Sequence, residues 1–195
     1  MERALFLIKM NQTCLLVDFS DSFFFNIKEV LTQQLGLKAI CIKGEDKESI
    51  AEVYKRNQCA FLMLGPGPGH IDDYNFSEEL WHFIESIPTL GVCLGHQFLC
   101  ARLGVRPINL ERPLHGKSLE LDELGQLLGV EKLRGQFYNS WAPNGSMPHA
   151  DSVSKYQGNI IYFHQKNWIG VQFHPESVGT TFPKEVLNAL LEKIV

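Results

Sequence analysis

The fold of this chain is decided by the stretch Thr89-Leu90-Gly91-Val92-Cys93-Leu94-Gly95-His96-Gln97, where a short apolar run leads into a cysteine flanked by glycines. This pattern is typical of a strand that turns sharply into a helix and presents a nucleophile at the turn. Gly91 and Gly95 stand where larger side chains would clash around such a turn. We therefore predict a strand at 89–92, a helix from Gly95 to about Leu103, and a reactive thiol on Cys93.

The sequence before this turn alternates apolar strand patterns with amphipathic helical patterns. The run at 13–18 is continuously apolar until its last residue, as expected of a parallel strand that is covered on both faces. Strands are predicted at 13–18, 37–42 and 60–64, and helices at 23–35, 48–56 and 76–87. This succession predicts an α/β fold with an open, mostly parallel, doubly wound sheet and right-handed connections.

The sequence after the turn is less regular. Glycine, proline and polar residues interrupt the runs between 105 and 165, which predicts antiparallel hairpins and one helical stretch near 122–128. A buried strand at 168–173 and an amphipathic helix at 183–194 are expected to close the fold.

The composition is that of an ordinary soluble globular protein, with 195 residues of which 45% are hydrophobic and 21% charged. This length predicts one domain at 13–195, preceded by an N-terminal extension at 1–12 with a start at Met1 or Met10. The net charge of −4 comes without a long basic run, so neither nucleic acid nor a membrane surface is expected as a partner. No run is long enough for a signal peptide or a membrane span, and we expect a cytoplasmic protein.

The five cysteines form an odd set without CxxC spacing, which favours a reducing compartment. We interpret Cys14, Cys41 and Cys59 as small apolar residues, the usual role of a lone cysteine. The histidines lack the spacing of metal ligands, so no metal is predicted.

A second motif, Gly170–Ser177, follows another apolar strand and contains His174, Pro175 and Glu176. In an extended chain residues i and i+2 point to the same side, so Glu176 can bond one ring nitrogen of His174. The other nitrogen would then take a proton from Cys93, as in a Ser-His-Asp triad. An ordinary surface turn is the alternative interpretation, but the buried strand before it favours a triad that acts on a small amide or ester.

A thiol with an ordinary pKa needs a base or the positive end of a helix to become a nucleophile. The helix predicted after Cys93 supplies such a positive end. The loop Gly65–Gly69 is either a rigid turn or part of an oxyanion hole, in which a glycine N–H acts together with the N–H of Leu94. No Lys followed by Ser or Thr stands at phosphate-loop spacing, so a nucleotide site is not expected.

Four elements in this order resemble the class I (triad) glutamine amidotransferases. They are 18–23 with Asn26, 66–69, 91–97 and 170–177. Within this family the chain is most similar to the glutaminase subunit of anthranilate synthase and aminodeoxychorismate synthase, which also has a His-Gly-Lys element like that at 115–117. The resemblance covers about residues 13–190, and it implies the same open parallel sheet with a nucleophile elbow.

The resemblance also implies a mechanism. Cys93 would attack the side-chain amide of L-glutamine to give a glutamyl thioester and ammonia, with His174 as base and then acid and Glu176 orienting it. The backbone N–H groups of Gly67 and Leu94 would hold the oxyanion. The positions matching the family's glutamine-binding residues are Gly67, Pro68, Gly69, Gln97, Ser140 and Trp141. No cofactor is implied, and ammonia would pass to a chorismate-aminating synthase subunit in a heteromer.

The chain departs from the subfamily at Tyr138-Asn139-Ser140-Trp141, where Tyr-His-Ser-Leu is usual, and the stretch between Cys93 and His174 is shorter than the family norm. Two alternatives stay open at this point. One is a stand-alone glutaminase or γ-glutamyl hydrolase of the same fold, and the other is an inactive homologue that acts as a binding or regulatory module. The sequence does not distinguish tryptophan from folate synthesis, because the partner subunit determines which ring position is aminated.

Overall fold

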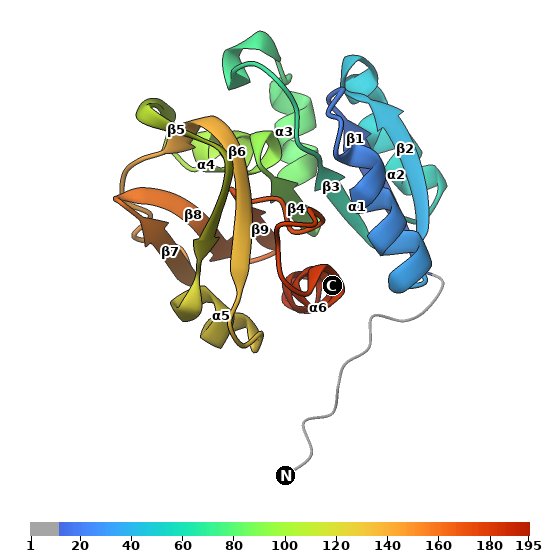
Figure 1. The fold of residues 1–195 in the computed structure, drawn as a ribbon. Helices are drawn as coiled ribbons and strands as arrows, with labels where there is room; N and C mark the ends of the chain where they lie inside the picture. The colour runs from blue at the N-terminus through green and yellow to red at the C-terminus, as the bar shows by residue number, and fades with distance from the viewer. Residues whose placement is uncertain (1–11) are drawn as a thin grey trace.

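The computed structural model describes residues 12–195, so the predicted extension and its two candidate start sites lie almost wholly outside the described residues. Seven strands form one sheet in the order β2-β1-β3-β4-β9-β8-β7 (Figure 1). Their bounds are Thr13–Asp18 (β1), Lys38–Lys43 (β2), Phe61–Leu64 (β3), Thr89–Val92 (β4), Ser152–Tyr156 (β7), Asn159–Gln165 (β8) and Trp168–Val171 (β9). Strands β2, β1, β3, β4 and β9 are parallel, whereas β8 pairs antiparallel with β9 and β7 pairs antiparallel with β8. The predicted open, mostly parallel α/β sheet is confirmed.

Helices cover both faces of this sheet. Their bounds are Phe24–Glu29 (α1), Val30–Gln34 (η1), Gly44–Ser49 (η2), Ile50–Arg56 (α2), Ile71–Asp73 (η3), Glu78–Glu85 (α3), Leu94–Arg102 (α4), Asp122–Leu128 (α5) and Pro183–Leu191 (α6). Successive side chains of β1 enter different cores: Cys14 and Leu16 join the cluster formed with α1, α5 and α6. Leu15 and Val17 join the cluster formed with α2, α3 and α4. This two-sided burial explains why β1 is continuously apolar.

A long two-stranded ribbon lies over the second half of the sheet (Figure 1). It consists of β5 (Pro107–Glu120) and β6 (Arg134–Pro143), and β6 contacts β8. The antiparallel register is interrupted between Asn109 and Leu114, so the backbone of Ser140 in β6 lies opposite a bulge. The antiparallel pairs predicted between 105 and 165 and the helix near 122–128 are present. Strand β6 lies near the carboxyl ends of β4 and β9.

Three predicted elements differ in detail. The helix expected at 23–35 is α-helical only to Glu29 and then widens into the π-helical η1. The helix expected from Glu48 begins as the 3-10 helix η2. The last parallel strand ends at Val171 and not at Phe173, because the chain leaves the sheet there and His174 pairs with Gln136 of β6 through an isolated bridge.

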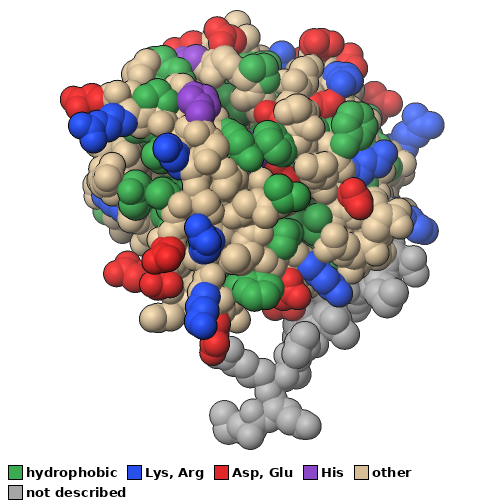
Figure 2. Space-filling model, in the orientation of Figure 1, with side chains coloured by type: hydrophobic (Ala, Val, Ile, Leu, Met, Phe, Trp, Pro, Cys, Tyr) green, Lys and Arg blue, Asp and Glu red, His purple; other side chains and the backbone are tan. Residues whose placement is uncertain are grey.

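The surface drawn in Figure 2 carries acidic and basic side chains interspersed with each other, and neither sign forms a continuous patch on this face. None of the helices within residues 12–195 is long and apolar enough to cross a membrane.

Candidate active site

Cys93 occupies the turn between β4 and α4 in a backbone conformation that residues with a side chain rarely adopt. Its φ is 53° and its ψ is −102°. Such a conformation costs on the order of 1–3 kcal/mol and persists only where the surroundings impose it. Here the Cys93 N–H donates to the Val171 carbonyl at 2.9 Å, and the Cys93 carbonyl accepts from the Gln97 N–H at 3.1 Å. The predicted nucleophile elbow is thus formed by β4, its neighbour β9 and the first turn of α4.

The two flanking glycines are required by close backbone approach. A Cβ atom on Gly91 would lie 2.6 Å from the Gly95 carbonyl, and one on Gly95 would overlap the carbonyl oxygen of Leu64. Gly95 also donates its N–H to the carbonyl of Gly65 at 3.2 Å, which fixes the start of α4 against the end of β3. The two glycines are therefore explained by the close packing of backbone atoms at the elbow.

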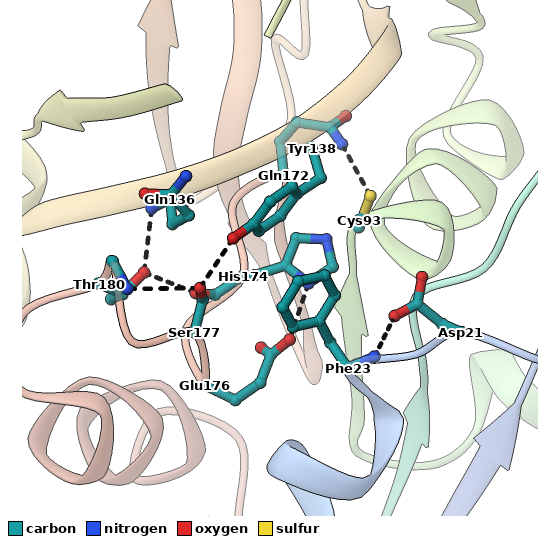
Figure 3. Close-up of polar contacts among 11 residues, drawn as sticks. Asp21, Phe23, Cys93, Gln136, Tyr138, Gln172, His174, Glu176, Ser177 and Thr180 are labelled. Carbon is teal, nitrogen blue, oxygen red and sulfur yellow. Dashed lines mark hydrogen bonds and ion pairs between the residues drawn. The ribbon is translucent and has the colours of Figure 1, made fainter. Parts of the chain in front are cut away.

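His174 and Glu176 form a buried pair beside Cys93 (Figure 3). The Nδ1 of His174 lies 2.7 Å from a carboxylate oxygen of Glu176, and both side chains are at most 1% exposed. The two residues meet across a turn, closed by the Ser177 N–H donating to the His174 carbonyl at 3.2 Å. The extended chain predicted between them is absent, although the predicted pairing is present.

The ring of His174 is held by contacts on several sides. Phe23, at the entrance to α1, and Tyr138 of β6 pack against it with ring centroids 5.2 and 5.1 Å away. Burial alone would lower the pKa of His174, but its interactions with Cys93 and Glu176 outweigh it and raise that pKa well above its ordinary value. The imidazolium form is therefore stabilised beside the sulfur and the carboxylate.

A cavity of about 400 Å³ opens in front of Cys93. Its walls contain every residue predicted from the sequence to hold the oxyanion or glutamine. The lining consists of Gly67, Pro68, Gly69, His70, Asp73, Cys93, Leu94, Gln97, His115, Tyr138, Asn139, Ser140 and Trp141. The structure thus brings together the loop after β3, the elbow after β4 and the middle of β6.

The two predicted oxyanion donors have free backbone N–H groups. Among the described residues, neither the N–H of Gly67 nor that of Leu94 donates a hydrogen bond to a protein acceptor. A Cβ atom on Gly67 would lie 2.5 Å from the Cβ of Phe19 and 2.7 Å from the Leu94 side chain, so the loop approaches α4 closely. Leu94 is the first residue of α4, where unpaired N–H groups and the helix dipole favour an anion.

A chain of side-chain amides connects the wall of the cavity with the sulfur, and sequence reasoning missed one member of it. The Nε2 of Gln97 donates to the Trp141 carbonyl at 2.9 Å and to the Oε1 of Gln172 at 3.2 Å. The Nε2 of Gln172 in turn donates to the Sγ of Cys93 at 3.6 Å (Figure 3). The signal in the sequence is a polar residue between Val171 and Phe173 in an otherwise apolar strand.

The rim of the cavity contains the residues that depart from the subfamily pattern. The Trp141 ring packs against His70 with centroids 4.5 Å apart. Asn139 donates its Nδ2 to the Trp141 carbonyl at 3.0 Å, while its Oδ1 is buried without a hydrogen-bond partner. The Ser140 hydroxyl is 2.8 Å from Nε2 of His115, within the His-Gly-Lys element. Asn139 therefore holds a buried acceptor without a hydrogen-bond partner at the position where the subfamily usually has histidine.

Cys100 is also beside a histidine, with its Sγ 3.6 Å from Nε2 of His96, but burial lowers the pKa of that histidine to about 4, so it stays neutral. Burial raises the pKa of Cys14 to about 12 and that of Cys100 well above the ordinary thiol value, so both stay protonated. Within residues 12–195 no group of three or more His, Cys, Asp or Glu side chains could hold a metal ion.

A parallel α/β sheet with a cysteine on a nucleophile elbow defines a class of enzymes that carry their nucleophile at the end of a central strand. The family model described as glutamine amidotransferase class-I matches residues 15–194. The chain therefore belongs to the class I glutamine amidotransferases, and its enzymatic activity is that of a glutamine amidotransferase.

Curated relatives agree with this assignment, and a solved structure has a similar fold. The chain is 32% identical over 188 residues to the aminodeoxychorismate/anthranilate synthase component 2 of Bacillus subtilis, covering 91% of this chain and 95% of that protein. It is 34% identical over 184 residues to the pyocyanine-specific anthranilate synthase component 2 of Pseudomonas aeruginosa, covering 90% and 92%. The fold is similar to that of a glutamine amidotransferase from Thermotoga maritima, with a TM-score of 0.63, 15% identity, and 94% of this chain and 98% of that chain covered.

Proposed function

We propose that this chain is the glutaminase subunit of a chorismate-aminating synthase, and that Cys93, His174 and Glu176 are its catalytic triad. The observation that carries the proposal is the strained elbow that holds Cys93 beside a buried His174–Glu176 pair, at the wall of a cavity of about 400 Å³. A cavity of this size suits a small amino acid, and the chain's family supplies the amide as the reacting group.

In the proposed reaction the Sγ of Cys93 attacks the Cδ of glutamine while His174 takes the thiol proton. The oxyanion that forms on the amide oxygen accepts hydrogen bonds from the N–H groups of Gly67 and Leu94. His174 then returns the proton to the amide nitrogen, the C–N bond breaks, and ammonia leaves a glutamyl thioester. Water, with its proton taken by His174, hydrolyses the thioester to glutamate and restores the thiol. Glu176 holds the imidazole orientation throughout.

The α-amino end of glutamine is proposed to lie against Gln97, Ser140 and Trp141, with Pro68 and Gly69 on the opposite wall. Both hydrogens of Gln97 Nε2 are already donated to protein acceptors, so only its Oε1 is left to accept a bond from the substrate ammonium. The side chain of Asn139 also lines this cavity, but its unpartnered Oδ1 is buried and is not counted as an acceptor for the substrate. The amide oxygen of Gln97 therefore supports recognition of a cationic α-amino group.

The proposed partner is a synthase subunit that binds chorismate and makes anthranilate or 4-amino-4-deoxychorismate. The support comes from relatives of this length that are named component 2 of such synthases. We further propose that the complex works in the cytoplasm, because all five cysteines are free thiols.

The test is hydrolysis of L-glutamine by the purified chain, with and without the chorismate-aminating component. We expect glutamate and ammonia to form and the rate to rise when the partner and chorismate are present. Cys93→Ser should lower kcat by about 10⁴-fold or more, since removal of one triad member disables the whole unit. The matched control is Cys41→Ser, in which an exposed thiol on β2 is lost and the rate should not change. Full glutaminase activity of Cys93→Ser would refute the mechanism.

The same assay separates the two alternatives. A rate that does not respond to any chorismate-aminating partner would favour a stand-alone hydrolase. No hydrolysis with or without a partner would favour a binding or regulatory module.

A further inference from the structure

The sulfur of Cys93 has a second buried neighbour besides His174. Gln172 is 1% exposed and lies one residue beyond the end of β9, in the segment that carries the chain from the sheet to the β5–β6 ribbon. Its Nε2 donates to the Cys93 Sγ at 3.6 Å, which is within the range of an N–H donor on sulfur. The imidazole of His174 and the amide of Gln172 are both drawn beside the sulfur in Figure 3.

The orientation of the Gln172 amide is fixed by its other end. Its Oε1 accepts a hydrogen bond from Gln97 at 3.2 Å, and Gln97 can act only as donor there because the same nitrogen also donates to the Trp141 carbonyl. The Gln172 oxygen must therefore face Gln97, and its NH₂ group must face the sulfur. A flipped amide would place two donors against each other in a buried site and leave the sulfur without this partner.

A thiolate gains more from such a donor than a thiol does, because a hydrogen bond to an ionised acceptor is about twice as strong as one between neutral groups. We propose that Gln172 is a further catalytic residue, whose side-chain N–H stabilises the thiolate of Cys93 and holds the sulfur at the wall of the cavity. Gln172 neither gains nor loses a proton in this role: the proton that leaves the Cys93 sulfur goes to His174. This inference rests on the proposed function for its role in turnover, but the contact with the thiolate exists without substrate.

The arrangement also makes Gln97 a positioning residue for the nucleophile. It lines the cavity at the proposed α-amino end of glutamine and at the same time orients the amide that contacts the sulfur. The wall that would recognise the substrate is therefore joined to the reacting atom by three successive hydrogen bonds, from the Trp141 carbonyl through Gln97 and Gln172 to Cys93.

The experiment measures alkylation of Cys93 by iodoacetamide as a function of pH, with mass spectrometry of the peptide that contains it. Gln172→Met keeps a similar length but removes the donor, and Gln172→Glu keeps an oxygen for Gln97 but turns a second oxygen toward the sulfur. For both variants we expect the rate at pH 7 to fall about tenfold or more and the midpoint of the rate against pH to move upward by about one unit, since the thiolate is the reacting form. In turnover, kcat should fall by a similar factor while KM changes less than about threefold.

Two controls make the result specific. The exposed Cys41 is labelled in the same samples and should react equally in all variants. Gln165→Met changes a half-buried glutamine at the end of β8, outside the cavity, and should leave the Cys93 profile unchanged. If Gln172→Met does not fold, Gln172→Leu provides the measurement, because it also removes the donor without adding a charge beside the sulfur.

A purely structural role for Gln172 would lower the melting temperature or the amount of folded protein without moving the midpoint of Cys93 alkylation, and that result would overturn the inference. The experiments distinguish failure of this inference from failure of the proposed function. If the wild-type chain hydrolyses no glutamine but its Cys93 profile still depends on Gln172, the proposed function is refuted and the thiolate contact is supported.

Discussion

Cys93 is maintained in an unfavourable backbone conformation by hydrogen bonds at both its N–H and its carbonyl, with φ at 53°. Cys93 lines the cavity in this conformation, at the place where α4 begins. The sequence predicted the elbow because glycines at 91 and 95 flank Cys93 directly after an apolar run. It did not predict Phe23 or Tyr138 beside His174, because no periodicity marks aromatic residues that meet from separate elements.

The raised pKa of His174 makes the stability of the protein depend on pH. Above about pH 6.5, the ordinary histidine value, the folded state holds a proton that the unfolded chain has released. The stability contributed by this group is fully present below about pH 6.5 and is lost as the pH rises through the folded-state pKa, so the free energy of unfolding should decrease as the pH rises above about 6.5. The decrease should be at most about 1.4 kcal/mol per pH unit.

Urea unfolding at several pH values measures this dependence. The control is His174→Gln, which lacks the titrating ring and should show a flatter dependence over the same range. An equal slope in the two proteins would show that other groups cause the pH dependence.

At the scale of elements, the parallel strands were predictable because burial on both faces leaves an unbroken apolar run, as in β1. The long strand β5 was not predictable as one element, because most of its residues are exposed and its register is broken by a bulge. The last parallel strand was predicted too long, because Phe173 continues the strand pattern in the sequence. The strand ends at Val171, although the Gln172 N–H still donates to the Ile161 carbonyl of β8.

The contact between α4 and β3 depends on glycine at position 95. Gly95→Ala would place a methyl group in overlap with the Leu64 carbonyl oxygen, and we expect it to lower the free energy of unfolding by about 2–3 kcal/mol. Gly104→Ala is the matched control just beyond the other end of α4: its φ is +87° but no atom lies within 4 Å of the added carbon, so a loss of about 1 kcal/mol is expected. Melting temperatures of the two variants give the comparison, and equal losses would contradict the packing argument.

At the scale of the whole molecule, the cavity exists only because the topology brings distant segments to one edge of the sheet. The loop after β3 and the elbow after β4 adjoin because these strands are paired, and β9 brings Gln172 and His174 to the same edge. The sequence predicted a role for each of these segments separately. The contribution of β6 through Asn139 and Trp141 depends on where the ribbon lies over the sheet, which local patterns do not determine.

The central claim is that Cys93 forms a covalent bond with the side-chain carbon of glutamine in this cavity. Its most direct test uses a glutamine analogue with an electrophilic diazoketone in place of the amide, followed by mass spectrometry of the intact and digested protein. We predict one adduct on the peptide that contains Cys93, prevented by excess L-glutamine and absent from Cys93→Ser. An adduct on another residue, or labelling of Cys93 that L-glutamine does not prevent, would contradict the account.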